Sequence, residues 1–79
     1  MVDPEQIEKW IQAGLACVHV EVRGDGHHFE AVIVSTAFSG KSRVQRHQLV
    51  YAALGDRMRA EIHALSMQTY APEEWAGNG

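Results

Sequence analysis

The chain has 79 residues, of which 46 % are hydrophobic and 22 % are charged, and its formal net charge is −3 at pH 7. A domain of this size buries only about 60 % of its unfolded surface, so one thin core is expected and a deep active-site pocket is not. The composition excludes the polar, highly charged class of disordered chains, and no apolar run is long enough to span a bilayer. We therefore expect a single small globular domain over residues 1–79.

The N-terminal segment MVDPEQIEKW lacks the basic start and apolar centre of a signal peptide, which predicts a cytoplasmic protein without membrane contact. Cys17 is the only cysteine, so neither an internal disulfide nor a CxxC metal motif can form. We interpret Cys17 as a small, partly buried hydrophobic residue. A metal site rich in thiolates would need ligands from another molecule, and no cofactor is expected in the chain alone.

A first helix is predicted over about residues 4–14. Asp3 is a suitable N-cap, Pro4 takes the first helical position, and Gln6 follows the cap by three residues. Apolar residues then recur at helical spacing, namely Ile7, Trp10, Ile11 and Leu15.

Two strands joined by a hairpin are predicted next. Apolar and polar residues alternate over residues 18–23, which is typical of a half-buried strand. Asp25 and Gly26 predict a tight turn in which both residues adopt positive φ. The run over residues 29–34 is apolar at nearly every position, which is typical of an interior strand.

The second half of the chain predicts helices around a third strand. Residues 38–41 form an expected loop, after which Ser42 and Gln45 make a capping box that opens a helix ending before Gly55. The residues expected on its apolar face are Val44, His47, Val50, Tyr51 and Leu54. A short helical turn over residues 56–60, a strand over 62–69 and a last helix from Pro72 follow, and residues 77–79 are expected to fray. The order α-β-β-α-α-β-α predicts a mixed α/β (α+β) fold with a three-stranded sheet and helices packed on one face.

A local basic segment stands out in this acidic chain. From Ala31 to Gly55 there is no acidic residue, whereas Lys41, Arg43 and Arg46 carry three positive charges. These side chains and the helix N-terminus could contact phosphates, and the alternative is an ordinary solvated helix face. Because three cations provide little affinity at cellular salt, useful binding of duplex DNA would need dimerisation or a second protein.

Histidines are the other candidate functional residues. His63 falls within the third predicted strand, where a neutral imidazole could bind a metal, and the alternative is a half-exposed strand residue. His27 and His28 are adjacent, so in a strand they would point to opposite faces and only one could serve a given site. His47 is predicted to be a core histidine that hydrogen-bonds nearby backbone. No nucleotide-binding loop, carboxylate pair or Ser-His-Asp order appears, which favours a protein without enzymatic activity.

Four stretches of the chain resemble the BolA family, especially its short IbaG-like branch. They are GDGHHF at residues 24–29, FSGKSRVQRHQLVY at 38–51, IHALSM at 62–67 and PEEW at 72–75. The resemblance runs in unbroken order from about residue 5 to residue 76 and implies a fold like that of the class II KH domain. Residues 39–42 hold only one glycine where a KH domain has its GxxG clamp, so RNA clamping of the KH type is not expected.

The resemblance also implies two activities. One is DNA binding in transcriptional control of envelope, shape and stress genes; the other is pairing with a monothiol glutaredoxin around a shared [2Fe-2S] cluster. It implies that His63 is a cluster ligand and that His27 or His28 supplies a second ligand, with partner thiolates completing the set. We expect the glutaredoxin role, with DNA binding by the basic segment as the rival, and a monomer or weak homodimer when the chain is alone.

Overall fold

The computed structural model describes residues 2–62 and 64–76, so the predictions for His63 and for the tail at 77–79 lie outside the described residues. The predicted order of elements is confirmed, with one short 3-10 helix added. The elements are α1 (Pro4–Gly14), β1 (Cys17–Gly24), β2 (His28–Ser35), η1 (Thr36–Phe38), α2 (Arg43–Leu54), α3 (Arg57–Ala60), β3 (Ala64–Tyr70) and α4 (Pro72–Ala76). None of the helices in these ranges has the length and apolar character needed to cross a membrane.

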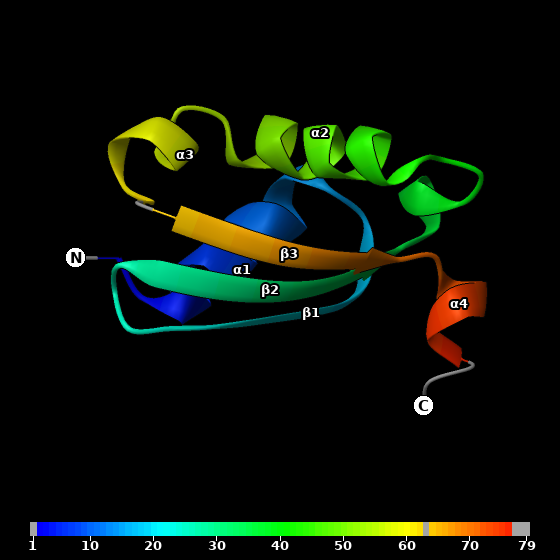
Figure 1. Cartoon of the computed structure of the whole chain (residues 1–79), viewed down its shortest axis with the longest axis horizontal. Helices are drawn as coiled ribbons and strands as arrows, with labels where there is room; N and C mark the ends of the chain where they lie inside the picture. Colours follow the sequence, from blue (N-terminus) through cyan, green and yellow to red (C-terminus); the bar gives the residue numbers. More distant parts are fainter. Residues whose placement is uncertain (1, 63, 77–79) are drawn as a thin grey trace.

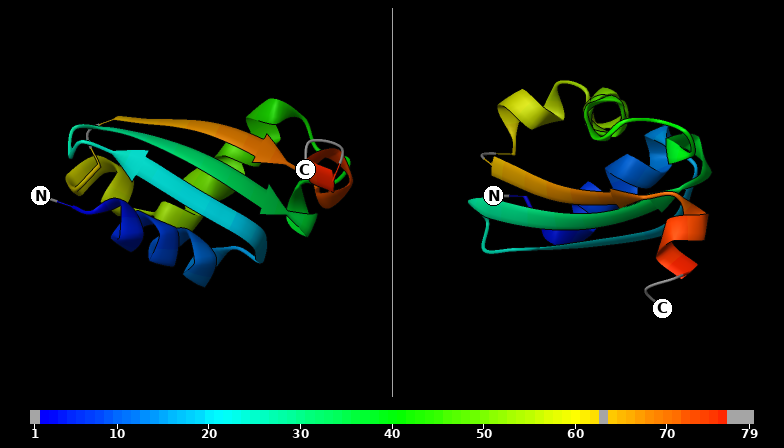
Figure 2. Two further views of the ribbon diagram at one scale, coloured as in Figure 1. Left: turned by 90° about the horizontal axis from the view of Figure 1, so that it is seen from below. Right: turned by 45° about the vertical axis from the view of Figure 1, so that its right-hand side comes forward.

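The three strands form one sheet in the order β1-β2-β3. β1 and β2 are an antiparallel hairpin, whereas β2 and β3 run parallel and are joined through α2 and α3. α1 and α2 cover one face of the sheet, as expected, and pack against each other (Figure 1). The short α4 differs, because it lies across one end of the opposite face (Figure 2).

The core lies between the sheet and the covering helices α1 and α2. It takes alternate residues of β2, with Phe29, Ala31 and Ile33 all nearly inaccessible to solvent, and it packs them against residues such as Ile11 and Leu54. This alternation sends the even-numbered residues of β2 to the opposite face of the sheet. The opposite face is therefore open and polar except where α4 covers it.

The hairpin turn differs from the predicted one in its backbone. Only Gly26 has a positive φ, of 100°, so the expectation of positive φ at Asp25 is wrong. Asp25 instead uses its carboxylate: Oδ1 accepts hydrogen bonds from the backbone N–H groups of His27 and His28, each at 2.9 Å. The turn is closed by a hydrogen bond from Asp25 N–H to the carbonyl of His28. A side-chain acceptor thus replaces the backbone geometry that the Asp-Gly pair suggested.

α2 begins as predicted, but the side that it buries is narrower than expected. Gln45 N–H donates to Ser42 Oγ at 3.2 Å, and Ser42 N–H donates to Gln45 Oε1 at 2.9 Å, which confirms the capping box. Val50 and Leu54 are fully buried, whereas Val44 is 65 % and Tyr51 is 42 % exposed. Val44 and Tyr51 are seven residues apart and therefore lie on the same side of α2. That side is next to the row, containing Val50 and Leu54, that faces the sheet and α1.

Candidate functional site

The two hairpin histidines lie at the turn between β1 and β2, and both side chains are exposed. His28 is the first residue of β2 and belongs to the even-numbered set on the open face. His27 precedes the strand, and Asp25 holds the backbone of both residues. Beside His28 the surface is hollowed by about 420 Å³, and the hollow is lined by Arg23, Gly24, Asp25, His28, Phe29, Glu30, Ala64 and Ser66.

The parallel pairing of β2 with β3 brings the first residue of β3 to this turn. Ala64 is the register partner of His28, and its N–H donates to the carbonyl of His27 at 3.2 Å. The residue that directly follows His63 is therefore held against the hairpin histidines. The joint use of His63 with His27 or His28 stays a prediction, as does the choice between the two.

Cys17 lies far from this turn. It pairs with Ser35 at the opposite end of the β1–β2 hairpin, whereas Gly24 and Phe29 pair beside the turn. Burial raises the pKa of the Cys17 thiol, so this group remains protonated and is a weak nucleophile. Within residues 2–62 and 64–76, no three His, Cys, Asp or Glu side chains are grouped so that they could hold a metal ion.

The basic segment is divided by the structure. Lys41 and Arg43 are exposed at the loop and first turn of α2, whereas the side chain of Arg46 is only 12 % exposed. Arg46 donates from Nε to the carbonyl of Lys41 at 2.9 Å and from one terminal nitrogen to the carbonyl of Thr69 at 3.3 Å. Its guanidinium also lies over the ring of Phe38, 6.0 Å from the centroid. Arg46 therefore holds the start of α2 to the end of β3.

Glu74 brings a carboxylate to a segment that has none in its own sequence. Its Oε1 accepts from Arg46 at 2.7 Å and from Ala71 N–H at 2.7 Å. These hydrogen bonds, the one from Arg46 first, lower the pKa of Glu74. The pairing joins α4 to α2 across 28 residues of sequence, which explains why no local pattern revealed it.

His47 lies half-buried in α2. Its ring nitrogen Nε2 is buried and finds no hydrogen-bond partner among the residues that the structure describes, so this atom does not make the predicted bond to nearby backbone. Burial, and then the charge of Arg43, lowers the pKa of His47. The backbone carbonyls close to it along the chain are used within the helix, which leaves Nε2 without a local acceptor.

An aromatic cluster on the open face was not identified from the sequence. The rings of His19 and Trp75 stack with centroids 5.2 Å apart and planes 19° apart, and Tyr70 lies 5.4 Å from Trp75. This cluster seats α4 over the end of the sheet. The alternation of His19 with valines predicted only the face of the sheet on which His19 lies. Nothing in the sequence indicated that Trp75 would stack on it.

Comparisons with known proteins agree with this architecture. A family model described as BolA-like protein matches residues 6–74. The chain is 37 % identical to the acid stress protein IbaG of Escherichia coli, over 95 % of this chain and 90 % of that one. It is 32 % identical to the DNA-binding transcriptional regulator BolA of Escherichia coli, over 98 % and 83 % of the two chains. The structure of a bolA protein homologue from Coxiella burnetii superimposes with a TM-score of 0.86 at 46 % identity, covering 96 % of this chain and 99 % of that one.

Proposed function

Because this chain belongs to the BolA family, we propose that it is a non-enzymatic, cytoplasmic regulatory protein that pairs with a monothiol glutaredoxin around a shared [2Fe-2S] cluster. The observation that carries the proposal is the pairing of His28 with Ala64. It places a histidine-rich turn beside the residue that follows His63. The role proposed for the pair is iron–sulfur trafficking or sensing.

The donor set fits half of such a site. All-cysteine [2Fe-2S] clusters take four thiolates, and two imidazoles replace two of them in some centres. The chain has one cysteine, Cys17, which is distant from the hairpin turn. The turn itself has two exposed imidazoles, those of His27 and His28. His63 with one hairpin histidine would bind one iron, and partner thiolates would bind the other. When bound, the cluster would supply one-electron redox chemistry or cargo for transfer.

The chain's own part in this function is to position imidazoles, which bind a metal ion only in their neutral form. The Asp25 carboxylate fixes the backbone of the turn, and the β2–β3 ladder fixes the start of β3. A neutral imidazole binds a metal ion and its protonated form does not, so mild acid would release this half of the site more readily than it would release thiolates.

Co-purification with a monothiol glutaredoxin from anaerobic cells, followed by visible absorption and iron analysis, tests the proposal. His63→Ala should abolish the mixed cluster or change its spectrum while the apo protein stays folded. His27→Ala and His28→Ala should differ: one should lose or alter the cluster as His63→Ala does, and the other should retain the spectrum of the parent. His19→Ala is the control for loss of an imidazole at the other end of the sheet, and its folding is checked because His19 stacks on Trp75. An unchanged spectrum in His63→Ala, with normal folding and glutaredoxin binding, would remove this function.

DNA binding is the second candidate, favoured by the exposure of Lys41 and Arg43 beside the N-terminus of α2. A helix N-terminus and two free cations can meet a phosphate backbone without reading its sequence. A relative from Escherichia coli is named a DNA-binding transcriptional regulator. Titration of duplex DNA with the parent and with Arg43→Ala at several salt concentrations tests this role.

A further inference from the structure

β3 is an edge strand, and its outer side carries backbone groups that no other strand pairs. Ala64 N–H donates inward to the carbonyl of His27, whereas the carbonyl of Thr69 points outward to Arg46. Because the hydrogen-bonding side alternates along a strand, Leu65 and Met67 also direct their backbone N–H and C=O groups outward. In the part of the chain that the structure describes, no hydrogen bond from outside the sheet reaches the backbone of these two residues.

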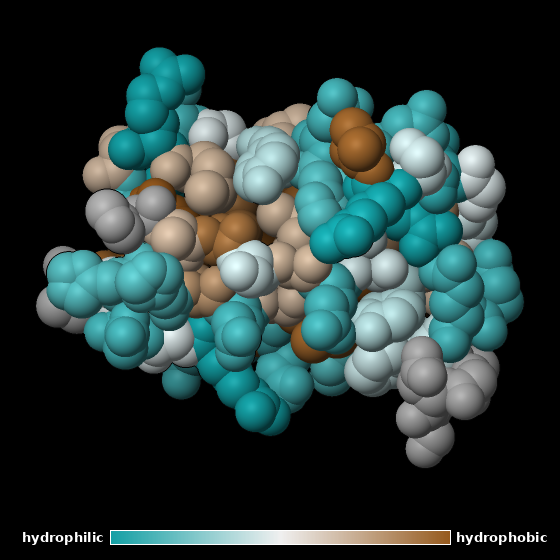
Figure 3. Space-filling model, in the orientation of Figure 1, coloured by the Kyte–Doolittle hydropathy of each residue, from teal (hydrophilic) through white to brown (hydrophobic). Residues whose placement is uncertain are grey.

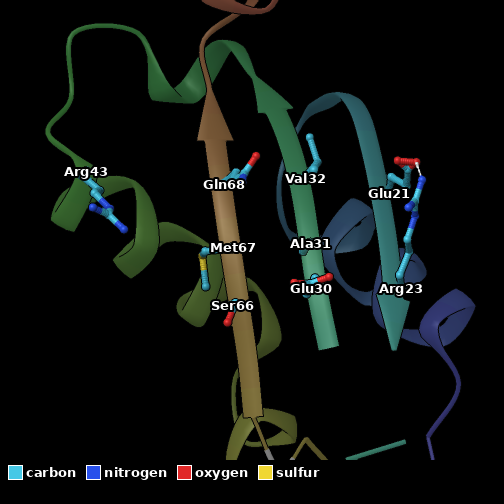
Figure 4. A pocket seen from close by; sticks show the side chains of 9 residues that line it. All are labelled: Glu21, Arg23, Glu30, Ala31, Val32, Arg43, Ser66, Met67 and Gln68. Atoms are coloured by element: carbon cyan, nitrogen blue, oxygen red, sulfur yellow. Dashed lines mark hydrogen bonds and ion pairs between the residues drawn. The ribbon is translucent and has the colours of Figure 1, made fainter. Parts of the chain in front are cut away.

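The surface beside this edge is hollowed, and most of the residues that line the hollows are polar or charged. Two hollows of about 410 and 330 Å³ adjoin the edge and share Arg43, Met67 and Gln68 in their linings. Figure 3 shows hydrophobic surface between α2, α3 and the β3 strand, on the face that presents the edge to the viewer. In Figure 4 the side chain of Arg43 extends from α2 toward β3, on the side from which Met67 leaves the strand. An unpaired strand edge is a surface to which extended peptides add as a further strand, and the neighbouring hydrophobic surface can receive every second side chain of such a strand.

The charge around the edge is uneven along its length. At the Tyr70 end the hollow is lined by Lys41, Arg43 and Arg46 and by one carboxylate, Glu74, which Arg46 already binds. Lys41 and Arg43 thus leave a positive charge at this end. A strand that carried acidic residues here would complement it, whereas a basic strand would be repelled.

We infer that the β3 edge binds an extended acidic segment of a partner protein, which adds as a fourth strand and meets Lys41 and Arg43 with its carboxylates. Every second side chain of that segment is apolar and packs on the hydrophobic surface between α2, α3 and β3. Neither hollow is lined by His27 or His28, but the larger one shares Arg23, Glu30 and Ser66 with the hollow beside His28. The two proposals are therefore distinguished by their variants, Arg43→Glu for the edge and His63→Ala for the cluster.

The probe is a synthetic peptide, Asp-Glu-Val-Thr-Val-Thr-Val, acetylated and amidated at its ends. Aligned antiparallel to β3, it puts its Asp-Glu end at the cationic end of the edge. Two control peptides carry Lys-Lys in place of Asp-Glu, or carry N-methyl groups on alternate residues so that one side cannot form a ladder. Amide chemical shifts of the ¹⁵N-labelled chain report the site of binding, and the shift changes against peptide concentration report the dissociation constant.

The peptide should shift the amides of Leu65, Met67 and Thr69, and the two control peptides should bind at least about tenfold more weakly. Arg43→Glu should weaken the acidic peptide by about tenfold or more and strengthen the Lys-Lys peptide. Lys9→Glu makes the same charge change on the exposed side of α1 and should leave both affinities within about twofold. Unperturbed amides outside the edge will show that each variant is folded.

Four results would overturn the inference. They are no binding at millimolar peptide, equal binding of the N-methylated peptide, shifts that map away from β3, and equal losses in Arg43→Glu and Lys9→Glu. A fifth is concentration-dependent protection of the Leu65 and Met67 amides without peptide, together with a dimer in sedimentation. That outcome would assign the edge to a second copy of the chain.

Discussion

The two ends of the sheet are built in different ways. At the hairpin end, Asp25 organises His27 and His28 through contacts spanning two or three residues of sequence. At the other end, Arg46 and Glu74 join α2 to α4 across 28 residues. The first end is exposed and locally determined, whereas the second is assembled only when the whole chain has folded.

This difference separates candidate function from stability. The side chains of Asp25, His27 and His28 lie outside the core, so they can be exchanged or take up a ligand without disturbing the packing of α1 and α2. At the α4 end, Arg46 donates hydrogen bonds to backbone and side-chain groups of three segments. Its loss should therefore lower the stability of the folded chain. Substitutions at each end should therefore affect different measurements.

The largest effect on stability is expected from Arg46→Ala. The substitution removes the guanidinium that donates to the carbonyl of Thr69 and to the carboxylate of Glu74, and it removes a mostly buried stem. A loss of about 2 kcal/mol in the free energy of unfolding is expected, or roughly 10 °C in the melting temperature. Urea and thermal unfolding measure it, with the exposed Arg43→Ala as the matched control. Equal stability of the two variants would show that the Arg46–Glu74 pair does not hold α4.

The pH dependence of stability is expected to report on His47, which lies in the middle of α2. Because burial lowers its pKa, the folded state binds fewer protons than the unfolded state once the pH falls below the ordinary histidine value. The contribution of the neutral ring is thus present above about pH 6.5 and is lost as the pH falls through the lowered folded pKa. His47→Gln should flatten the decline in urea midpoint between about pH 7 and pH 5. An unchanged slope would mean that His47 titrates freely.

His47→Ala is expected to lower the melting temperature at neutral pH, because it removes packing from the buried side of the helix. A matched truncation on the exposed side is Tyr51→Ala, which should cost less because Tyr51 is 42 % exposed. A greater loss in Tyr51→Ala would contradict the burial pattern of α2.

The Asp25 carboxylate is expected to order the hairpin turn. Asp25→Ala removes the acceptor for the N–H groups of His27 and His28 and should loosen the turn, whereas Asp25→Asn retains an acceptor oxygen. These hydrogen bonds lower the pKa of Asp25, so the ionised carboxylate contributes above its ordinary value of 3.8 and the contribution is lost as the pH falls through the folded pKa. Amide exchange at residues 27 and 28 should speed up in Asp25→Ala only. Equal exchange in both variants would show that the carboxylate does not order the turn.

How much the sequence could predict follows the same division. The capping box at Ser42, the hairpin and the order of elements along the chain are encoded by neighbouring residues, and all three were predicted. The engagement of Arg46 by Glu74 and the stacking of His19 on Trp75 could not be, because the partners meet only through the parallel addition of β3 and the turn into α4. Periodicity identified α2 but not its buried side, since a short helix packed against one sheet edge and one neighbour buries a narrow row.

The smallest effect is expected from Arg43→Ala on binding of duplex DNA. Arg43 is exposed and free to reach a phosphate, so its removal should weaken binding uniformly across sequences and reduce the salt slope by about one unit. Arg46→Ala should change DNA binding less than Arg43→Ala below its own melting transition, because Arg46 is already occupied by Glu74 and two carbonyls. Fluorescence anisotropy at several salt concentrations, on protein checked for folding by circular dichroism, measures both. A greater loss of affinity in folded Arg46→Ala than in Arg43→Ala would show that Arg46 leaves Glu74 to contact DNA, and the contrast between an open hairpin end and a fixed α4 end would not hold.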